Sequence, residues 1–169
     1  MGFLDRLRGR DDEGAVPSAR PSAPPPDDEH GDALDDLEPV EEIGTRRLTA
    51  EEEAGLESVR ARYADHGIDP ADLSTIAAAW DRAVAGADAD DDSATEVVDV
   101  IGTAVGDHLV TAGYRWVVSS DPFGTDLAVE PPRKGVPVVT RMLVAVRWMA
   151  RESGWVTGVV EHLARSGRR

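Results

Sequence analysis

The chain of 169 residues contains no cysteine. Disulfides, thiolate catalysis and cysteine-based metal sites are therefore excluded, and the composition suits a reducing cytoplasm. No apolar run reaches the roughly 18 residues that a membrane-spanning helix needs, and no signal-peptide core follows the start. Positive charge is also scarce, since 18 Lys and Arg side chains are set against 33 Asp and Glu, a formal net charge of -15. Such a chain repels phosphates, so we expect no nucleic-acid partner. The lack of cysteine, of a long apolar run and of a signal-peptide core leads us to expect a cytoplasmic address.

Charge is unevenly distributed along the sequence. Residues 1–46 hold 5 basic and 13 acidic side chains, residues 47–132 hold 5 and 18, and residues 133–169 hold 8 and 2. The N-terminal part is rich in proline and acid and has too little apolar surface to offset chain entropy. The sequence therefore predicts a short amphipathic segment at 1–8, a disordered acidic tether at 9–46, and a single α+β domain at 47–166.

The first eight residues place Phe3, Leu4 and Leu7 on one face of a short helix. A helix of this length is marginal alone, so we interpret Met1–Arg8 as a frayed terminus. Docking on a partner or peripheral contact with a membrane is the alternative. The tether that follows is interpreted as a solvated chain, and the sharper alternative is an acidic tail that masks a basic surface elsewhere.

Helical periodicity dominates the chain on both sides of a central hairpin. Thr49 is a plausible N-cap for the first helix, and glycines end the first three. Gly102 and Gly106 stand four apart on the third helix, a spacing that permits close approach of another element. The pattern predicts three N-terminal helices at about 49–66, 70–85 and 93–112, and two C-terminal helices at 141–151 and 155–163.

The hairpin lies between these two groups of helices. Residues 114–119 are aromatic and β-branched, residues 121–124 have the proline and glycine of a reversing turn, and residues 125–129 resume apolar alternation. Residues 136–140 are a candidate third strand, at an edge because of Pro137. The fold class predicted is α+β, with a two- or three-stranded antiparallel sheet between the helices and a disordered acidic tail before them.

The hairpin region also resembles a bacterial family, frequent in actinobacteria, that is classed as a domain of unknown function. The matching residues are the helical stretch 102–107, the strand Trp116-Val117-Val118, and the turn from Asp121 to Ala128, with its D-x-x-G-T-D-L-A pattern. The resemblance covers roughly residues 75–165. It implies a fold and a cytoplasmic address, and it supplies no activity.

Few residues suggest chemistry. Asp121 and Asp126 flank the turn, where they either share a metal or act as an acid/base pair, or simply cap backbone groups. Asp107 and His108 are adjacent on a helix and do not face one another. The sequence contains no phosphate-binding loop, dinucleotide fingerprint or nucleophile elbow, and its four histidines lack ligand spacing. We expect no catalytic residue, no cofactor and no metal.

Tryptophans and arginines gather in the C-terminal half, and these two residue types often anchor protein interfaces. They either line a groove or, as tryptophans commonly do, belong to the core. We expect a non-catalytic protein-binding or regulatory module with an unidentified protein partner; the alternative is a small hydrolase or metal-dependent enzyme that uses the hairpin carboxylates. The candidate binding face comprises Trp116, Asp121, Asp126, Arg141, Arg147, Trp148 and Arg151.

Overall fold

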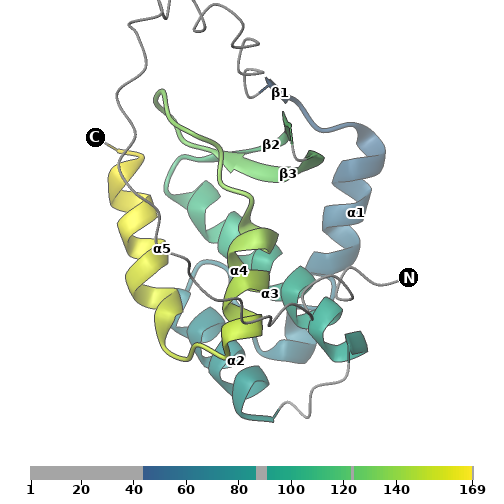
Figure 1. Cartoon of the computed structure of the whole chain (residues 1–169), viewed down its shortest axis with the longest axis vertical. Coiled ribbons are helices and arrows are strands. Elements are labelled where there is room, and N and C mark those ends of the chain that lie inside the picture. The colour runs from purple at the N-terminus through teal and green to yellow at the C-terminus, as the bar shows by residue number, and fades with distance from the viewer. Residues whose placement is uncertain (1–43, 87–90, 123, 169) are drawn as a thin grey trace, which may run out of the picture. The chain divides into compact units, whose positions relative to one another are not determined.

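The computed structural model describes residues 44–86, 91–122 and 124–168. Over these residues the chain forms five α-helices, one short 3-10 helix and a three-stranded antiparallel sheet, which confirms the α+β class (Figure 1). The predicted segment 1–8 and residues 9–43 of the predicted tether lie outside the described residues. The elements are β1 (Gly44–Arg46), α1 (Ala50–Arg60), the 3-10 helix η2 (Ala64–His66), α2 (Leu73–Gly86), α3 (Asp91–Thr111), β2 (Arg115–Asp121), β3 (Gly124–Glu130), α4 (Thr140–Ala150) and α5 (Trp155–Ser166).

The third strand of the sheet differs from the one predicted. Residues 136–140 contribute one isolated bridge, in which Val138 and Val129 exchange two backbone hydrogen bonds of 2.9 Å. The pairing cannot continue beyond Val138, because α4 already begins at Thr140. The third strand is instead β1, which we had placed in the tether, so the predicted order of helices, sheet and helices is incomplete.

Side chains attach β1 to the domain. The guanidinium of Arg46 donates hydrogen bonds of 2.8 and 2.7 Å to the two carboxylate oxygens of Glu52 in α1. Thr49 and Glu52 also form a capping box, in which each side chain accepts from the other residue's backbone N–H. The predicted N-cap is therefore confirmed, and the same cap joins the first strand to the first helix.

Two predicted helix boundaries are wrong. The first helix ends at Arg60 rather than Gly67, because the chain tightens into η2, and Gly67 then adopts a φ of 62°. The second helix begins at Leu73 rather than Pro70. Asp72 accepts from the Ser74 N–H at 2.9 Å and so caps the start of this helix.

The core is centred on Trp80 of α2, which is fully buried. Its ring meets those of Trp148 and Trp155 edge to face, with centroids 5.9 and 5.5 Å away. The indole N–H donates to the Glu152 carbonyl at 2.8 Å, so its polar group is satisfied. The three tryptophans therefore join α2, α4 and α5.

Gly102 and Gly106 are sites of close packing, as their spacing suggested. A Cβ on Gly102 would lie 3.0 Å from the Arg141 Cα at the start of α4. A Cβ on Gly106 would lie 2.2 Å from the Trp116 ring. The two glycines thus let α4 and the Trp116 side chain approach α3.

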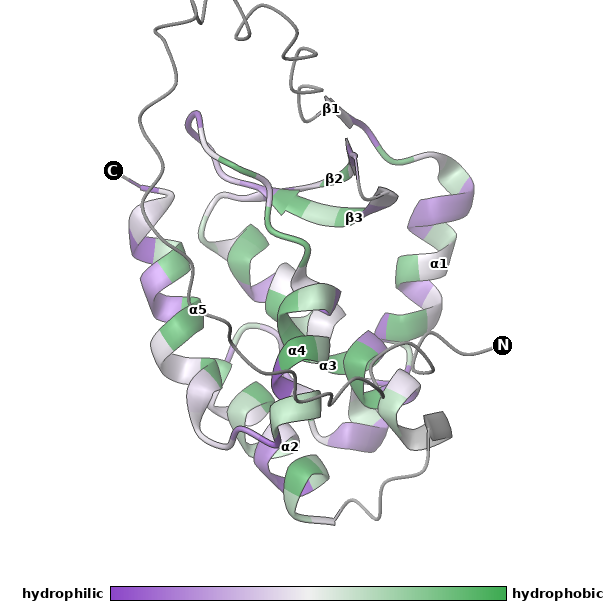
Figure 2. Ribbon diagram, viewed as in Figure 1, coloured by the Kyte–Doolittle hydropathy of each residue, from purple (hydrophilic) through white to green (hydrophobic). Residues whose placement is uncertain are grey.

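The helices lie below the sheet in the view of Figure 1, with α1 and α5 on opposite sides. The α4 helix packs against both α3 and β3. In Figure 2 the ribbon of α1 carries several purple, hydrophilic segments, whereas that of α4 is largely green and white. A helix of such apolar composition is expected to be covered on most sides.

Candidate functional site

The outward face of α4 is apolar and exposed. Met142, Val146 and Met149 are 59%, 49% and 78% exposed. Their spacing of four and then three residues places them on one side of the helix. We call these three residues the α4 stripe.

The opposite side of α4 accounts for its place in the fold. Thr140, Val144 and Trp148 recur every four residues and are buried. Only two residues of α4 carry charge, Arg141 and Arg147, and neither belongs to the stripe. The helix is therefore apolar on two sides, of which the core covers one.

A surface pocket of about 360 Å³ opens at the tip of the hairpin. Its polar wall comes from the ends of β2 and β3, and its apolar wall comes from Val139 and Met142. Since Met142 belongs to both features, the pocket and the α4 stripe form one continuous surface. The lining residues are Ser119, Asp121, Gly124, Thr125, Asp126, Val139 and Met142.

The two hairpin carboxylates both line this pocket, and both bind backbone groups of the hairpin. Asp121 accepts from the Gly124 N–H at 3.0 Å, and Asp126 accepts from the Leu127 N–H at 2.7 Å. The Asp121 contact closes the reversing turn, as the capping interpretation proposed. The structure thus brings the two residues to one pocket and gives each of them a local structural role.

The predicted arginines are occupied by neighbouring side chains. Arg141 forms an ion pair with Asp99 of α3. The Arg147 guanidinium lies 4.6 Å from the Trp155 ring centroid, and that of Arg151 lies 4.4 Å from the Trp148 ring centroid. These cation–π contacts cover the tryptophan core from outside.

The tryptophans do not line a groove. Trp148 is 7% exposed and Trp155 4%, so both are core residues. Trp116 is half-buried on β2, where its ring lies against Gly106 of α3. The predicted binding face is therefore split among the core, the hairpin pocket and the flanks of α4.

Sequence reasoning missed the cluster around Asp107. This carboxylate accepts from the Arg60 Nε at 2.8 Å and Nη2 at 2.5 Å, from the Tyr63 hydroxyl at 2.8 Å, and from the Trp116 indole N–H at 2.9 Å. Burial opposes ionisation of Asp107, but the hydrogen bonds from Arg60, Trp116 and Tyr63 outweigh it and lower its pKa. The Asp107 cluster joins α1, α3 and β2, and four donors leave the carboxylate little capacity for a ligand.

The neighbouring His108 has a separate partner. Its Nδ1 lies 2.9 Å from the Pro70 carbonyl oxygen and therefore donates to it. The two residues that are adjacent in the sequence thus serve different contacts, as their helical geometry predicted.

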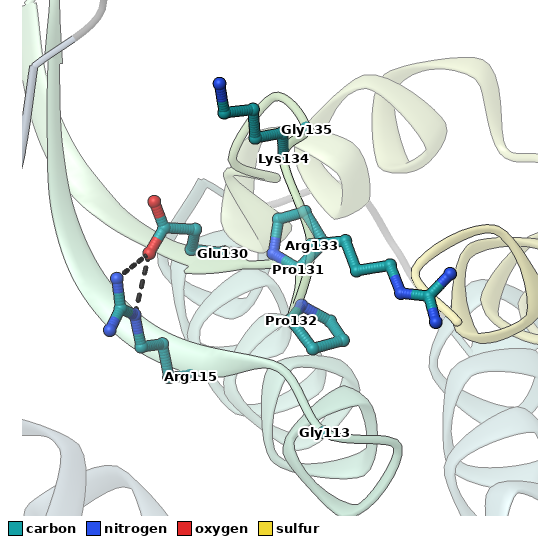
Figure 3. Close-up of a pocket in the computed structure, with 8 residues that line it drawn as sticks. All are labelled: Gly113, Arg115, Glu130, Pro131, Pro132, Arg133, Lys134 and Gly135. Carbon is teal, nitrogen blue, oxygen red and sulfur yellow. Dashed lines mark hydrogen bonds and ion pairs between the residues drawn. The ribbon is translucent and has the colours of Figure 1, made fainter. Parts of the chain in front are cut away.

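A second pocket, of about 460 Å³, lies under the loop at 131–135 (Figure 3). Three cations line it, but Arg115 donates to Glu130, at 2.7 Å from Nε. Figure 3 shows the Arg133 side chain pointing away from that ion pair, to the right, and the Lys134 side chain pointing upward in a different direction. These cations therefore do not converge on a common anion.

Within the described ranges, no group of three or more His, Cys, Asp or Glu side chains is placed to hold a metal ion. In the same part of the chain, no helix is both long enough and apolar enough to span a membrane.

The architecture is thus a small α+β domain with a packed tryptophan core and an exposed apolar helix face. Residues 72–158, just over half of the chain, match the domain of unknown function DUF3806, and the chain belongs to this family. The match runs from the cap of α2 through the hairpin and α4 into α5. Neither a curated protein nor a solved structure matches the chain. The expected membership of a family classed as a domain of unknown function is confirmed.

Proposed function

We propose that this protein is a non-catalytic binding module that docks a protein partner on the α4 stripe. The observation that carries the proposal is the exposure of Met142, Val146 and Met149 on one face of a helix whose other face is buried. Contiguous apolar surface of this kind is characteristic of docking sites. Methionine suits such a surface because its flexible thioether side chain adapts to the contour of a partner.

The geometry of the stripe indicates the form of the partner. Anchors spaced four and three residues apart follow one line along a helix, and such lines pack against the apolar side of a second helix or an extended segment. The adjoining hairpin pocket would accept one further apolar side chain at the end of this line. The net charge of -15 disfavours nucleic acid, and we propose that the module acts in the cytoplasm.

The proposal is tested by affinity capture with the full chain as bait and a lysate of the source organism. Val146→Asp together with Met149→Asp places two charges on the stripe, where a docked partner would have to desolvate them. We expect the specifically captured protein, identified by mass spectrometry, to bind this variant at least tenfold more weakly in a subsequent titration.

The matched control is Val110→Asp together with Val136→Asp, which makes the same kind of change at exposed apolar positions outside α4. This control should retain the wild-type affinity. If both double variants capture the same proteins with the same affinity as the wild type, the stripe is not the docking face.

A metal-dependent enzyme is the second candidate, because the hairpin pocket brings Asp121 and Asp126 together beside Ser119. Carboxylate oxygens are the ligands that Mg²⁺ and Mn²⁺ prefer. Calorimetric titration of the full chain with each ion tests this candidate, with Asp121→Asn/Asp126→Asn as the comparison. Heat released by the wild type and abolished in the variant would support a metal site, and equal traces would eliminate it.

A further inference from the structure

A third surface pocket lies between the loop at 131–138 and the C-terminal end of α5. Its volume is about 380 Å³, which is large enough to hold an apolar side chain of a partner. Two basic side chains line it, Arg133 and Lys134, and none of the described residues that line it is acidic. The apolar lining residues are Tyr114, Pro131, Val136, Val138 and Leu163. We call this feature the α5 pocket.

The walls of the α5 pocket are held in place by the fold. The Tyr114 hydroxyl donates to the Leu163 carbonyl at 2.7 Å, and a Cβ on Gly167 would lie 2.6 Å from the Tyr114 ring. Val138 exchanges two backbone hydrogen bonds with Val129 of β3. The pocket is thus built from α5, the edge of the sheet and a tyrosine that joins them. A partner would pay little to order it.

The charge around the α5 pocket is opposite to that of the whole chain. Residues 133–169 hold 8 basic and 2 acidic side chains, in a chain of net charge -15. Glu130 and Glu161, on the elements that border the pocket, are each paired with an arginine. Lys134 and the exposed Arg168, by contrast, form no ion pair with any described residue. Because salt screens exposed charges beyond about 8 Å, the pocket presents a local positive surface despite the negative total.

We propose that the α5 pocket docks an acidic segment of a protein partner. One aliphatic or aromatic side chain of the segment enters the pocket, and flanking carboxylates lie beside Arg133 and Lys134. Figure 3 shows these two side chains pointing in different directions from the loop, an arrangement that suits carboxylates at separate positions along a segment rather than one small anion. No residue of the α4 stripe lines this pocket, so the inference goes beyond the proposed function and identifies a second docking site.

Charge directs such a segment to this part of the surface. Residues 47–132 hold 5 basic and 18 acidic side chains, so they repel a carboxylate-rich partner. Like charges that meet across an interface suppress binding, whereas opposite charges steer the partner and fix its register. The α5 pocket therefore combines an apolar cavity with the sign of charge that an acidic segment requires.

The probe is a fluorescein-labelled peptide, Glu-Asp-Leu-Trp-Asp-Glu, titrated with the full chain and followed by fluorescence anisotropy. One comparison peptide has Gln and Asn in place of the acids, and another has Ala in place of Leu and Trp. We expect either replacement to weaken binding by about fivefold or more, because the first removes the charges and the second removes the side chains that can enter the pocket. Equal binding of the three peptides would overturn the inference.

Lys134→Glu/Val136→Asp changes the charge and the apolar wall of the pocket together. Val136 is 70% exposed, so the fold should tolerate the change, and urea unfolding checks this. We expect the acidic peptide to bind this variant about tenfold more weakly or worse. The matched control, Arg47→Glu/Val110→Asp, makes the same change of charge at exposed positions outside the pocket and should bind within about twofold of the wild type. Wild-type affinity in K134E/V136D would overturn the inference.

Amide NMR spectra of the ¹⁵N-labelled full chain locate the bound peptide. Gly135 and Gly167 line the pocket, so their signals should shift on titration, whereas that of Gly55 on α1 should not. Shifts confined to other parts of the chain would overturn the assignment. Lys134-dependent binding to phosphatidylglycerol vesicles without binding of the peptide would assign the surface to an anionic membrane instead.

The capture experiment keeps the two docking sites apart. Val136 is also altered in V110D/V136D, the control for the stripe. A protein docked on the stripe should be retained by that control and lost by V146D/M149D. A protein docked in the α5 pocket should show the reverse pattern, so each proposal can fail without the other.

Discussion

The Asp107 cluster and the hairpin pocket both place carboxylates beside an indole or an apolar side chain, but they use them differently. Asp107 accepts from Arg60, Tyr63 and Trp116, which come from three different parts of the fold. Asp121 and Asp126 accept from backbone groups within three residues of themselves. The half-buried Asp107 thus joins three elements of the fold, whereas the exposed Asp121 and the half-buried Asp126 stabilise only their own hairpin and line a surface pocket.

The largest expected effect is that of Asp107→Ala. The substitution leaves the Arg60 guanidinium, the Tyr63 hydroxyl and the Trp116 indole without their acceptor in a partly buried site. We expect a loss of about 3–4 kcal/mol in the free energy of unfolding, measured by urea titration. Asp126→Ala removes one short-range hydrogen bond at a half-exposed position and should cost less than about 1 kcal/mol. Equal losses of unfolding free energy in Asp107→Ala and Asp126→Ala would contradict the distinction between the Asp107 cluster and the hairpin pocket.

A smaller effect is expected from Gly106→Ala, which tests how the Trp116 ring reaches Asp107. The new Cβ would lie 2.2 Å from the ring, so the indole must move and its hydrogen bond to Asp107 must lengthen. Overpacking of this kind costs about 1–3 kcal/mol. Gly55→Ala on α1 is the matched control, since its Cβ meets nothing within 4 Å. Removal of a mid-helix glycine should stabilise the protein by about 0.5–1 kcal/mol in the same urea titration.

The pH dependence of stability sharpens the comparison further. Because the folded-state pKa of Asp107 is lowered, its contribution is present above the unfolded pKa of about 3.9 and is lost as the pH falls through the folded value. Burial and the neighbouring Asp107 carboxylate raise the pKa of Tyr63, so its contribution is present below about pH 10 and declines as the pH rises further. Asp107→Asn should flatten the acid side of the profile of unfolding free energy against pH. A profile between pH 2 and 5 that is unchanged in this variant would show that other carboxylates control acid unfolding.

How much of this organisation is predictable from sequence depends on the range of the interactions. The Thr49 cap, the reversing turn at Asp121–Gly124 and the close packing at Gly106 follow from local rules about caps, turns and glycine, and the structure bears them out. The Asp107 cluster depends on Arg60 and Tyr63, which are 47 and 44 positions away, and no local pattern links them. The pairing of β1 with β2 is missed for the same reason, because three exposed residues have too little apolar alternation to predict a strand.

The α4 stripe was missed for a different reason. The residues from 141 to 151 clearly predict a helix, but their apolar residues are so numerous that periodicity does not separate the buried side from the exposed one. Val144 and Trp148 face the core, whereas Val146 and Met149 do not. The sequence did contain a signal for the stripe, which is the scarcity of charge in α4. A helix with only two charged residues has more apolar surface than contact with the core on one side can cover.

The smallest expected effect on stability belongs to the stripe itself. Val146→Asp/Met149→Asp alters two exposed positions with no hydrogen-bonding or core role, so the free energy of unfolding should change by less than about 0.5 kcal/mol at each position. Val144→Ala, on the fully buried side of the same helix, should cost about 1–3 kcal/mol through lost burial and the cavity that it leaves. Thermal and urea unfolding of the two variants measure this contrast directly. A large loss of unfolding free energy in V146D/M149D would mean that other parts of the folded chain cover the stripe and that these contacts contribute to folding. A negligible loss would mean that folding does not require the stripe to be apolar, which strengthens the case for a docked partner.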